Sequence, residues 1–338
     1  MLSALKNTLF ASLLYLLWAG STYAQRPFII DTDVGVDDVV AILYLLQHPQ
    51  IQIQAITIAS DGNAHCQPAL NNTLGLLLMM KQPSIPVACG QEKPLSGHHH
   101  FPDKVLKESD TLAGAAQLLP HAPPNSKLNA VDLMIKTIKN ASEPVTLLAI
   151  GPLTNIAQAL QKAPQMKKKI RAIYIMGGAI QASGNIRAID PTSKNLNAEW
   201  NIYIDPLAAQ IVLSQKIPVV LIPLDITNQL PIDMNFYTAI KQRHKSAAAN
   251  FVFILLKNNI KMIHQHYWYF WDPLAAVIAS DHSIAHVKTQ YIKIILSPEI
   301  QSGATVIDHA KKNKVYVVTQ VDKKRVEIML IHYLNKFL

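Results

Sequence analysis

The stretch Phe28-Ile29-Ile30-Asp31-Thr32-Asp33-Val34-Gly35-Val36-Asp37-Asp38 decides the fold of this chain. Four carboxylates crowd into eight residues at the end of an apolar run, and each ionised acid raises the cost of ionising the next. A divalent cation would offset that crowding, and oxygen-rich sites suit a hard ion such as Ca²⁺ or Mg²⁺. Helix capping would explain one of these aspartates, but not all of them. The stretch therefore predicts a metal site where a buried strand gives way to a helix.

Short β-branched runs alternate with helical patterns along most of the chain. The expected strands are 28–30, 51–59, 87–89, 145–150, 170–176 and 219–224, and the expected helices are 37–47, 69–80, 130–140, 155–161 and 206–213. This alternation favours a doubly wound, mostly parallel α/β sheet of the Rossmann-like kind, with helices on both faces. The part after residue 228 is expected to be more helical, since residues 251–263 are apolar at helical spacing.

Polar or glycine-containing segments follow the expected strands. They are 31–33, 61–63, 151–155, 177–178 and Asp225. In parallel α/β sheets the ligand binds beyond the carboxyl ends of the strands. These segments therefore predict one rim that carries the site, and the long polar loops 60–68, 90–110 and 184–205 are expected to serve it.

The first residues have the pattern of a secretory signal. Lys6 supplies a basic n-region, residues 8–19 form an apolar h-region, and Thr22-Tyr23-Ala24 is a small-x-small cleavage site. We therefore expect residues 1–24 to be a signal peptide and residues 25–338 to form a single domain. The mature protein is expected to be periplasmic or secreted and free of the membrane. An uncleaved anchor is the lesser alternative, because the apolar run is short for a membrane span.

Composition narrows the class of protein. Half of the 338 residues are hydrophobic and 16% are charged, which predicts a large core and excludes a disordered chain. The formal net charge is +9, but no interleaving of basic and aromatic residues indicates a nucleic-acid module, so a solvated basic face is favoured over a nucleic-acid partner. Cys66 and Cys89 could pair in an exported protein, while two buried free thiols are at least as plausible.

Two enzyme families begin with an aspartate-rich element of this kind. In haloacid-dehalogenase-like phosphatases the nucleophile lies in D-x-D-x-T, but Gly35 occupies the threonine position here. The stretch 31–41 instead resembles the nucleoside hydrolase signature D-x-D-x-G-x-D-D-x-x-A. The resemblance continues in order at 62–63, 151–155, 176–179, 184–185, 198–201, 205–206 and 271–275. It covers nearly the whole mature chain and implies the nucleoside hydrolase fold.

The resemblance also implies an activity and a set of site residues. The reaction would be Ca²⁺-dependent hydrolysis of the N-glycosidic bond of ribonucleosides, and the family commonly forms homodimers or other homo-oligomers. Asp33 would bridge Ca²⁺ and the attacking water and act as general base. The metal ligands would be Asp33, Asp38, Asp272 and the backbone carbonyl near Leu153, and the ribose would contact Asp37, Asn63, Met176, Asn185, Glu199 and Asn201. Such a ring of oxygen atoms would stabilise an oxocarbenium-like sugar.

Two tryptophans depart from the common family pattern. Trp271 stands before Asp272, where many members carry a histidine thought to protonate the leaving base, and Trp200 stands where a phenylalanine is common. Both features resemble the purine-preferring (inosine–adenosine–guanosine) branch, in which a tryptophan stacks on the purine and favours its protonated form. We therefore expect purine ribonucleosides as substrates, with Trp271 activating the leaving base and Trp200 contacting the substrate.

Several alternatives stay open at this point. Residues 98–102 match the place of a second stacking tryptophan in that branch, so Phe101 or a neighbouring histidine could stack or act as an acid, or the histidines form a solvated run. Residues 264–270 are expected to form a lid over the base, and His264 and His266 lack the further ligands of a zinc site. A broad-specificity or pyrimidine-active hydrolase and a nucleoside-binding protein without turnover remain alternatives.

Overall fold

The computed structural model describes residues 25–336, so the expected signal peptide lies outside the described residues. Within that range the strands are β1 (Arg26–Thr32), β2 (Ile51–Ile58), β3 (Val87–Cys89), β4 (Val145–Ile150), β5 (Ile170–Met176), β6 (Val219–Ile222), β7 (Ala285–Ile294), β8 (Thr305–Ile307) and β9 (Lys314–Val321). They form one nine-stranded sheet in the order β3-β2-β1-β4-β5-β6-β9-β7-β8. The strands from β3 to β9 in this order pair in parallel, whereas β7 is antiparallel to β9 and β8. The expected mostly parallel α/β sheet is confirmed.

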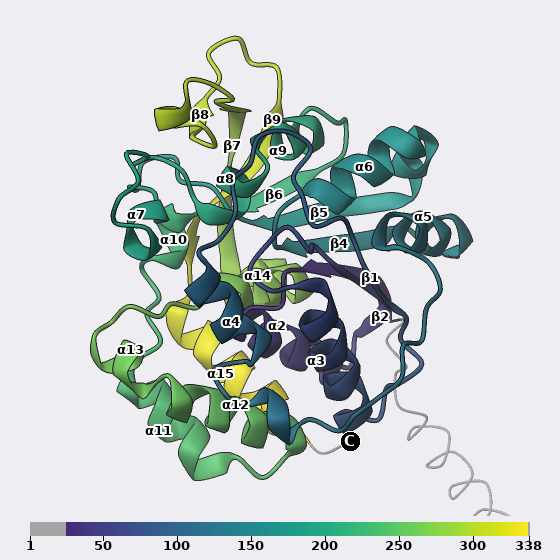
Figure 1. The fold of residues 1–338 in the computed structure, drawn as a ribbon, viewed down its shortest axis with the longest axis vertical. Helices are drawn as coiled ribbons and strands as arrows, with labels where there is room; N and C mark the ends of the chain where they lie inside the picture. Colours follow the sequence, from purple (N-terminus) through teal and green to yellow (C-terminus); the bar gives the residue numbers. More distant parts are fainter. Residues whose placement is uncertain (1–24, 337–338) are drawn as a thin grey trace, which may run out of the picture.

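Helices cover both faces of the sheet (Figure 1). They are α2 (Val36–Leu46), α3 (Cys66–Met79), α4 (Asp103–Asp110), α5 (Ala130–Asn140), α6 (Thr154–Lys162), α7 (Ile186–Ile189), α8 (Trp200–Ile204), α9 (Pro206–Leu213), α10 (Leu224–Thr227), α11 (Met234–Arg243), α12 (Ala247–Asn258), α13 (Ile260–His264), α14 (Trp271–Ser280) and α15 (Lys323–Leu334). One face packs against α5, α6 and α9, and the other against α2, α3, α12, α14 and α15.

The sheet divides the hydrophobic core into two layers. Side chains alternate between the faces of a strand, so Phe28 and Ile30 of β1 lie in one cluster and Ile29 lies in the other. All three side chains are fully buried. Strand β1 lies inside the sheet and is covered by helices on both faces. Asp31, near its carboxyl end, is therefore buried.

The part after residue 228 is rich in helix, as expected, but it also contains strands that the sequence analysis does not predict. Helices α11 to α15 are present, but β7, β8 and β9 extend the sheet where the prediction has no strand after residue 224. Strand β7 is hard to recognise because it mixes exposed residues such as His286 and Lys288 with apolar ones. A register shift between His286 and Val287 also interrupts its alternation.

Cys66 and Cys89 are joined in a disulfide between the start of α3 and the end of β3. The alternative of two free thiols is therefore wrong. In the part of the chain that the structure describes, no helix combines the length and the apolar character needed to cross a bilayer.

Candidate active site and metal centre

Acidic side chains from three places in the sequence converge at the carboxyl end of the central strands. Asp33 follows β1, Asp37 and Asp38 lie in the first turn of α2, and Asp272 lies in the first turn of α14. One oxygen from each of Asp37, Asp38 and Asp272 lies within 4.8 Å of the others. Helix N-termini stabilise nearby negative charge, so the starts of α2 and α14 together favour this arrangement.

Hydrogen bonds fix the orientation of Asp38. The hydroxyl of Thr32 donates to its Oδ1, and the backbone N–H of Gly35 donates to its Oδ2 at 2.9 Å. Thr32 is the last residue of β1 and Gly35 caps α2, so the strand-to-helix turn itself holds this carboxylate toward the rim.

Backbone from two neighbouring loops presses against Asp33. The N–H of Asn63 donates to Asp33 Oδ2 at 2.9 Å. A Cβ atom on Gly62 would lie 2.3 Å from Asp33 Cβ, and one on Gly151 would lie 2.9 Å from the Asp33 backbone nitrogen. Only a residue without a side chain permits such approaches, which explains the glycines after β2 and β4.

Burial and mutual repulsion disfavour negative charge at this site. Burial raises the pKa of Asp38 to about 7, with the Asp37 charge adding to the rise. Burial, and then the charge of Asp38, raise the pKa of Asp33 well above its usual range. Burial, and then the charge of Asp37, do the same to the pKa of Asp272. A cation would reverse this penalty.

Several buried polar atoms near the cluster have no hydrogen-bond partner among residues 25–336. Two of them, Oδ1 of Asn63 and Nε1 of Trp271, belong to residues expected at the ligand. Buried polar atoms in proteins are normally paired, so both point to a bound group. Together with the convergent carboxylates, they show that the donor set fits a hard metal ion and a polar ligand.

Asp31 supports this cluster from behind. Its Oδ1 accepts from Thr57 Oγ1 at 2.6 Å and from Asn155 Nδ2 at 2.9 Å. Burial raises its pKa to about 7. Asn155 lies in the first turn of α6, which follows β4, so Asp31 ties this part of the expected rim to β1 and β2.

The residues expected at the ribose fall into two groups. Asp37 and Asn63 lie beside the metal-site carboxylates, whereas Met176 ends β5, and Asn185, Glu199 and Asn201 lie in the segment after it. Glu199 caps α8, accepting from the N–H groups of Asn201 at 3.0 Å and Gly178 at 3.0 Å, and burial raises its pKa to about 7. Asn201 Nδ2 donates to the carbonyl of Met176 at 3.2 Å. Asn185 Oδ1 accepts from the N–H of Trp200 at 3.1 Å.

Comparison with known proteins agrees with this geometry. The profile of the family described as inosine-uridine preferring nucleoside hydrolase matches residues 28–327. The chain belongs to this nucleoside hydrolase family. A pyrimidine-specific ribonucleoside hydrolase RihA from Salmonella agona (strain SL483) is 34% identical over 310 residues, which cover 88% of this chain and 94% of the relative.

Solved nucleoside hydrolases share the fold. The plant nucleoside hydrolase PpNRh1 is 28% identical, covers 92% of this chain and 99% of its own, and has a TM-score of 0.82. A purine-preferring ribonucleoside hydrolase from Gardnerella vaginalis is 26% identical, covers 92% and 98% of the two chains, and has a TM-score of 0.76. The fold expected from the resemblance is thus confirmed, and the chain is a nucleoside hydrolase.

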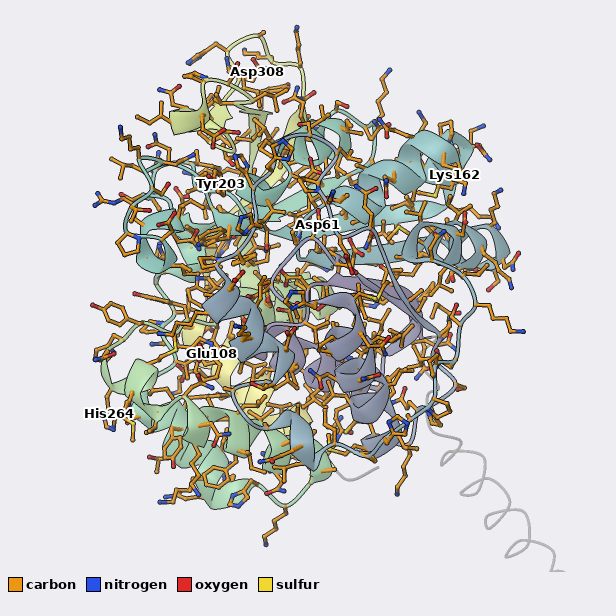
Figure 2. The ribbon with its side chains drawn as sticks, in the orientation of Figure 1. Asp61, Glu108, Lys162, Tyr203, His264 and Asp308 are labelled. Atoms are coloured by element: carbon orange, nitrogen blue, oxygen red, sulfur yellow. A yellow bond between two sulfur atoms is a disulfide. The ribbon has the colours of Figure 1, made fainter. Side chains whose placement is uncertain are left out.

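Trp200 is packed inside this nucleoside hydrolase by aromatic neighbours. Its ring stacks on Phe101 with centroids 4.4 Å apart and meets Tyr203 edge-on at 5.7 Å. The His99 ring stacks on that of Tyr203 with centroids 3.8 Å apart. Tyr203 lies in α8 and is labelled in Figure 2. Phe101 therefore stacks on Trp200, and the alternative that Phe101 or a neighbouring histidine stacks on a base stays open. A direct contact of Trp200 with substrate stays a prediction.

Trp271 begins α14 and is half-buried beside Asp272. Its ring lies 5.4 Å from that of Tyr269. The preceding residues are anchored, because Tyr269 bridges to Pro231 and the N–H of Phe270 donates to the carbonyl of Leu230 at 2.9 Å. The end of the expected lid is therefore fixed to the protein.

The exposed part of that segment lies at the periphery. His264, His266 and Tyr267 are exposed, and Figure 2 shows His264 at the outer edge, away from Asp61 in the middle of the molecule. Among the described residues the two histidines join no group of potential metal ligands.

The loop after β4 approaches the site through backbone. Leu153 is fully buried, and its carbonyl accepts from the N–H of Ala157 at 2.9 Å as α6 begins. A carbonyl oxygen has a second lone pair, so the ligand role of Leu153 stays a prediction. Gly151 is the residue of this loop that packs directly on Asp33.

Sequence reasoning overlooked a buried polar link behind the rim. Thr154 Oγ1 lies 2.5 Å from Asp61 Oδ2 and 2.8 Å from Asp205 Oδ2. Burial raises the pKa of Asp61 to about 6. Asp61 follows the end of β2 and precedes Gly62. This position at a strand end is the sequence signal that indicates a role for Asp61 at the rim. Asp225 follows β6, as expected, in the first turn of α10, and accepts from the N–H groups of residues 180–182.

Proposed function

We propose that this nucleoside hydrolase cleaves the N-glycosidic bond of ribonucleosides in a Ca²⁺-dependent reaction. The observation that carries the proposal is the convergence of Asp37, Asp38 and Asp272 within 4.8 Å. Asp33, Asp38 and Asp272, with a carbonyl of the loop at Leu153, would hold the ion. When bound, Ca²⁺ would supply positive charge that neutralises these carboxylates and lowers the pKa of water nearby.

Asp33 is the proposed general base. Its Oδ2 already accepts from the N–H of Asn63, so the backbone orients the carboxylate, and an ionised carboxylate can accept a proton from water. Asp33 takes a proton from water, the water oxygen bonds to C1′ of the ribose, and the C1′–N electrons leave with the base. The departing base takes up a proton from solvent, Asp33 returns the proton it accepted to solvent, and the products are ribose and the free base.

Asp37, Asn63 and Asn201 are the proposed ribose-binding residues. The unpaired Oδ1 of Asn63 can accept from a sugar hydroxyl. Carboxylate and amide oxygens around the sugar stabilise the positive charge that develops as the bond breaks. Glu199 caps α8 and positions Asn201, because its carboxylate accepts from the backbone N–H of Asn201.

We propose broad specificity that includes pyrimidine ribonucleosides. The support is the pyrimidine-specific relative, which is 34% identical along 88% of this chain. Purine preference is the second candidate and has one specific observation in its favour. Trp271 presents an indole with an unpaired Nε1 beside Asp272, and an indole face suits a protonated purine.

A direct comparison of uridine and inosine tests this proposal. Free ribose is measured with Ca²⁺ present, with Asp33→Asn as the matched inactive control. Release from uridine at a rate comparable to or above that from inosine supports pyrimidine activity. Release from inosine alone would overturn it in favour of purine preference, and binding of both nucleosides without release would overturn hydrolysis itself.

We further propose that the protein is exported and acts as a homo-oligomer. The signal-like pattern of residues 1–24 and the Cys66–Cys89 disulfide support export, because disulfides persist in oxidising compartments. Mass spectrometry of the mature N-terminus tests cleavage after Ala24, and an intact Met1 in the fractionated protein would contradict it. Light scattering tests the oligomer, and a monomer mass would contradict that proposal.

A further inference from the structure

The disulfide lies between two segments that reach the buried aspartates. Cys66 is the first residue of α3 and Cys89 is the last residue of β3. The sequence contains two cysteines in all, so a reductant acts on a single bond. Both cysteines are half-buried, and the bond is therefore partly accessible.

On the Cys66 side, the chain runs directly into the loop that orients Asp33. Asn63, three residues earlier, donates its N–H to Asp33 Oδ2 at 2.9 Å. Gly62 touches Asp33 so closely that a Cβ atom would lie 2.3 Å from its Cβ. The position of this backbone, rather than any side chain of the loop, holds the proposed base.

On the Cys89 side, the chain runs into a contact that supports Asp31. A Cβ atom on Gly90 would lie 1.9 Å from Asn155 Oδ1, and Asn155 Nδ2 donates to Asp31 Oδ1 at 2.9 Å. Strand β3 has three residues and stands at the edge of the sheet, where it pairs with β2. A strand so short gains little stability from its own pairing.

Noncovalent contacts also restrain the segments near the bond. The N–H of Gly90 donates to the carbonyl of Ile58 at 2.8 Å, and His65 contacts Asp110. Asp110 accepts from the N–H of His65 at 2.9 Å and contacts its Nδ1 at 2.7 Å, but the His65 side chain is 57% exposed. Exposed pairs of this kind contribute little to stability. The covalent bond is thus the strongest connection between the loop before α3 and the edge strand.

We propose that the Cys66–Cys89 disulfide is a positioning element of the active site. It keeps the Asn63 N–H on Asp33 and Gly90 against Asn155, and its reduction lowers turnover without unfolding the protein. The proposal rests on the role of Asp33 as general base. Reduction by a dithiol breaks the S–S bond, leaves two cysteine thiols and converts the reagent to its cyclic disulfide.

Hydrogen exchange tests whether the disulfide holds the loop before α3 in place, and it needs neither substrate nor metal. The full-length mature protein is compared with and without dithiothreitol, and the peptide spanning residues 59–66 is followed. Reduction is expected to speed amide exchange in this peptide by at least about 10-fold, while peptides from α5 and α9 are unchanged. Equal exchange in the two states would overturn the proposal, whatever the enzyme's substrate proves to be.

Steady-state kinetics test whether reduction of the disulfide lowers turnover. Reduction is expected to lower kcat/KM for ribose release by roughly 10-fold, since small misplacements of catalytic groups are costly. The Cys66→Ser/Cys89→Ser double variant should show the same loss and no response to dithiothreitol. Val87→Ala is the matched control, because it weakens the packing of β3 while the disulfide stays. A comparable loss in Val87→Ala at equal Tm would reduce the effect to general destabilisation and overturn the proposal.

Discussion

The backbone N–H of Asn63 donates to Oδ2 of Asp33 at 2.9 Å, joining the loop after β2 to the end of β1. This bond leaves Oδ1 of Asp33 for other partners. It also explains why Gly62 is needed, because the backbone must come within contact distance of the Asp33 side chain. The proposed base is therefore positioned by main chain, which is a rigid way to hold a reacting group.

Asp33→Asn is expected to lower kcat by about 10²- to 10⁴-fold, because the amide cannot accept the proton from water. The fold should persist, since an amide oxygen still accepts from the Asn63 N–H. Steady-state ribose release and a thermal melt measure both quantities. A variant with wild-type kcat would remove Asp33 from the base role.

Asp272→Asn should have opposite effects with and without Ca²⁺. In EDTA the variant should melt above wild type, because one member of a mutually repelling group is neutralised. In Ca²⁺ it should melt below wild type, with an affinity for the ion reduced by at least about 10-fold. Asp132→Asn, which removes a charge from an exposed pair with Lys162, is the matched control and should change neither quantity. Equal calcium affinity in the wild type and Asp272→Asn would exclude Asp272 as a ligand.

The pH dependence of stability should reverse when Ca²⁺ is added. Burial raises the pKa of Asp31 and that of Asp38 from 3.8 to about 7, so between these values the folded state binds more protons than the unfolded chain. Stability of the EDTA-treated protein should therefore be greatest at low pH and fall as the pH rises toward 7. With Ca²⁺, which binds the deprotonated carboxylates, the Tm gain from the ion should grow over the same interval. Thermal melts of the metal-free and Ca²⁺-bound protein across this pH range check the prediction. A Tm of the metal-free protein that rises toward pH 7 would contradict it.

Gly62→Ala should disturb the base directly, because the added methyl would lie 2.4 Å from Asp33 Oδ2 as well as against its Cβ. A methyl group 2.3 Å from Asp33 Cβ forces the backbone apart, at a cost of about 1–3 kcal/mol. We expect a lower Tm and a drop in kcat, measured by melting and ribose release. Normal activity in this variant would show that the Asn63 loop need not stay close to Asp33.

Trp271→Ala should alter the balance between bases. If the indole contacts the leaving base, kcat/KM for inosine should fall by roughly 10-fold or more, and further than for uridine. Trp271→Phe keeps an aromatic face and should recover part of the loss. An unchanged ratio of inosine to uridine in both variants would exclude Trp271 from base selection.

The sequence predicts the central sheet well, because β1 and β4 are buried along nearly their whole length and read as mostly apolar runs. Helices 130–140 and 206–213 are found with the predicted bounds. The exposed strand β7 escaped prediction because a strand with one wet face and a register shift lacks a clean period. The convergence of Asp37 and Asp38 with Asp272 could not be inferred from spacing alone, since only the packing of α14 on α2 creates it. The family resemblance supplied Asp272. The stack of Phe101 on Trp200 depends on two loops meeting, which no local pattern encodes.

The most direct test of the central claim is the release of ribose from uridine and inosine by protein stripped with EDTA, before and after Ca²⁺ is restored. The account predicts no release from the stripped protein, full recovery with Ca²⁺, and no recovery in Asp33→Asn. Release that continues undiminished in excess EDTA, or nucleoside binding with no release at any Ca²⁺ concentration, would contradict it.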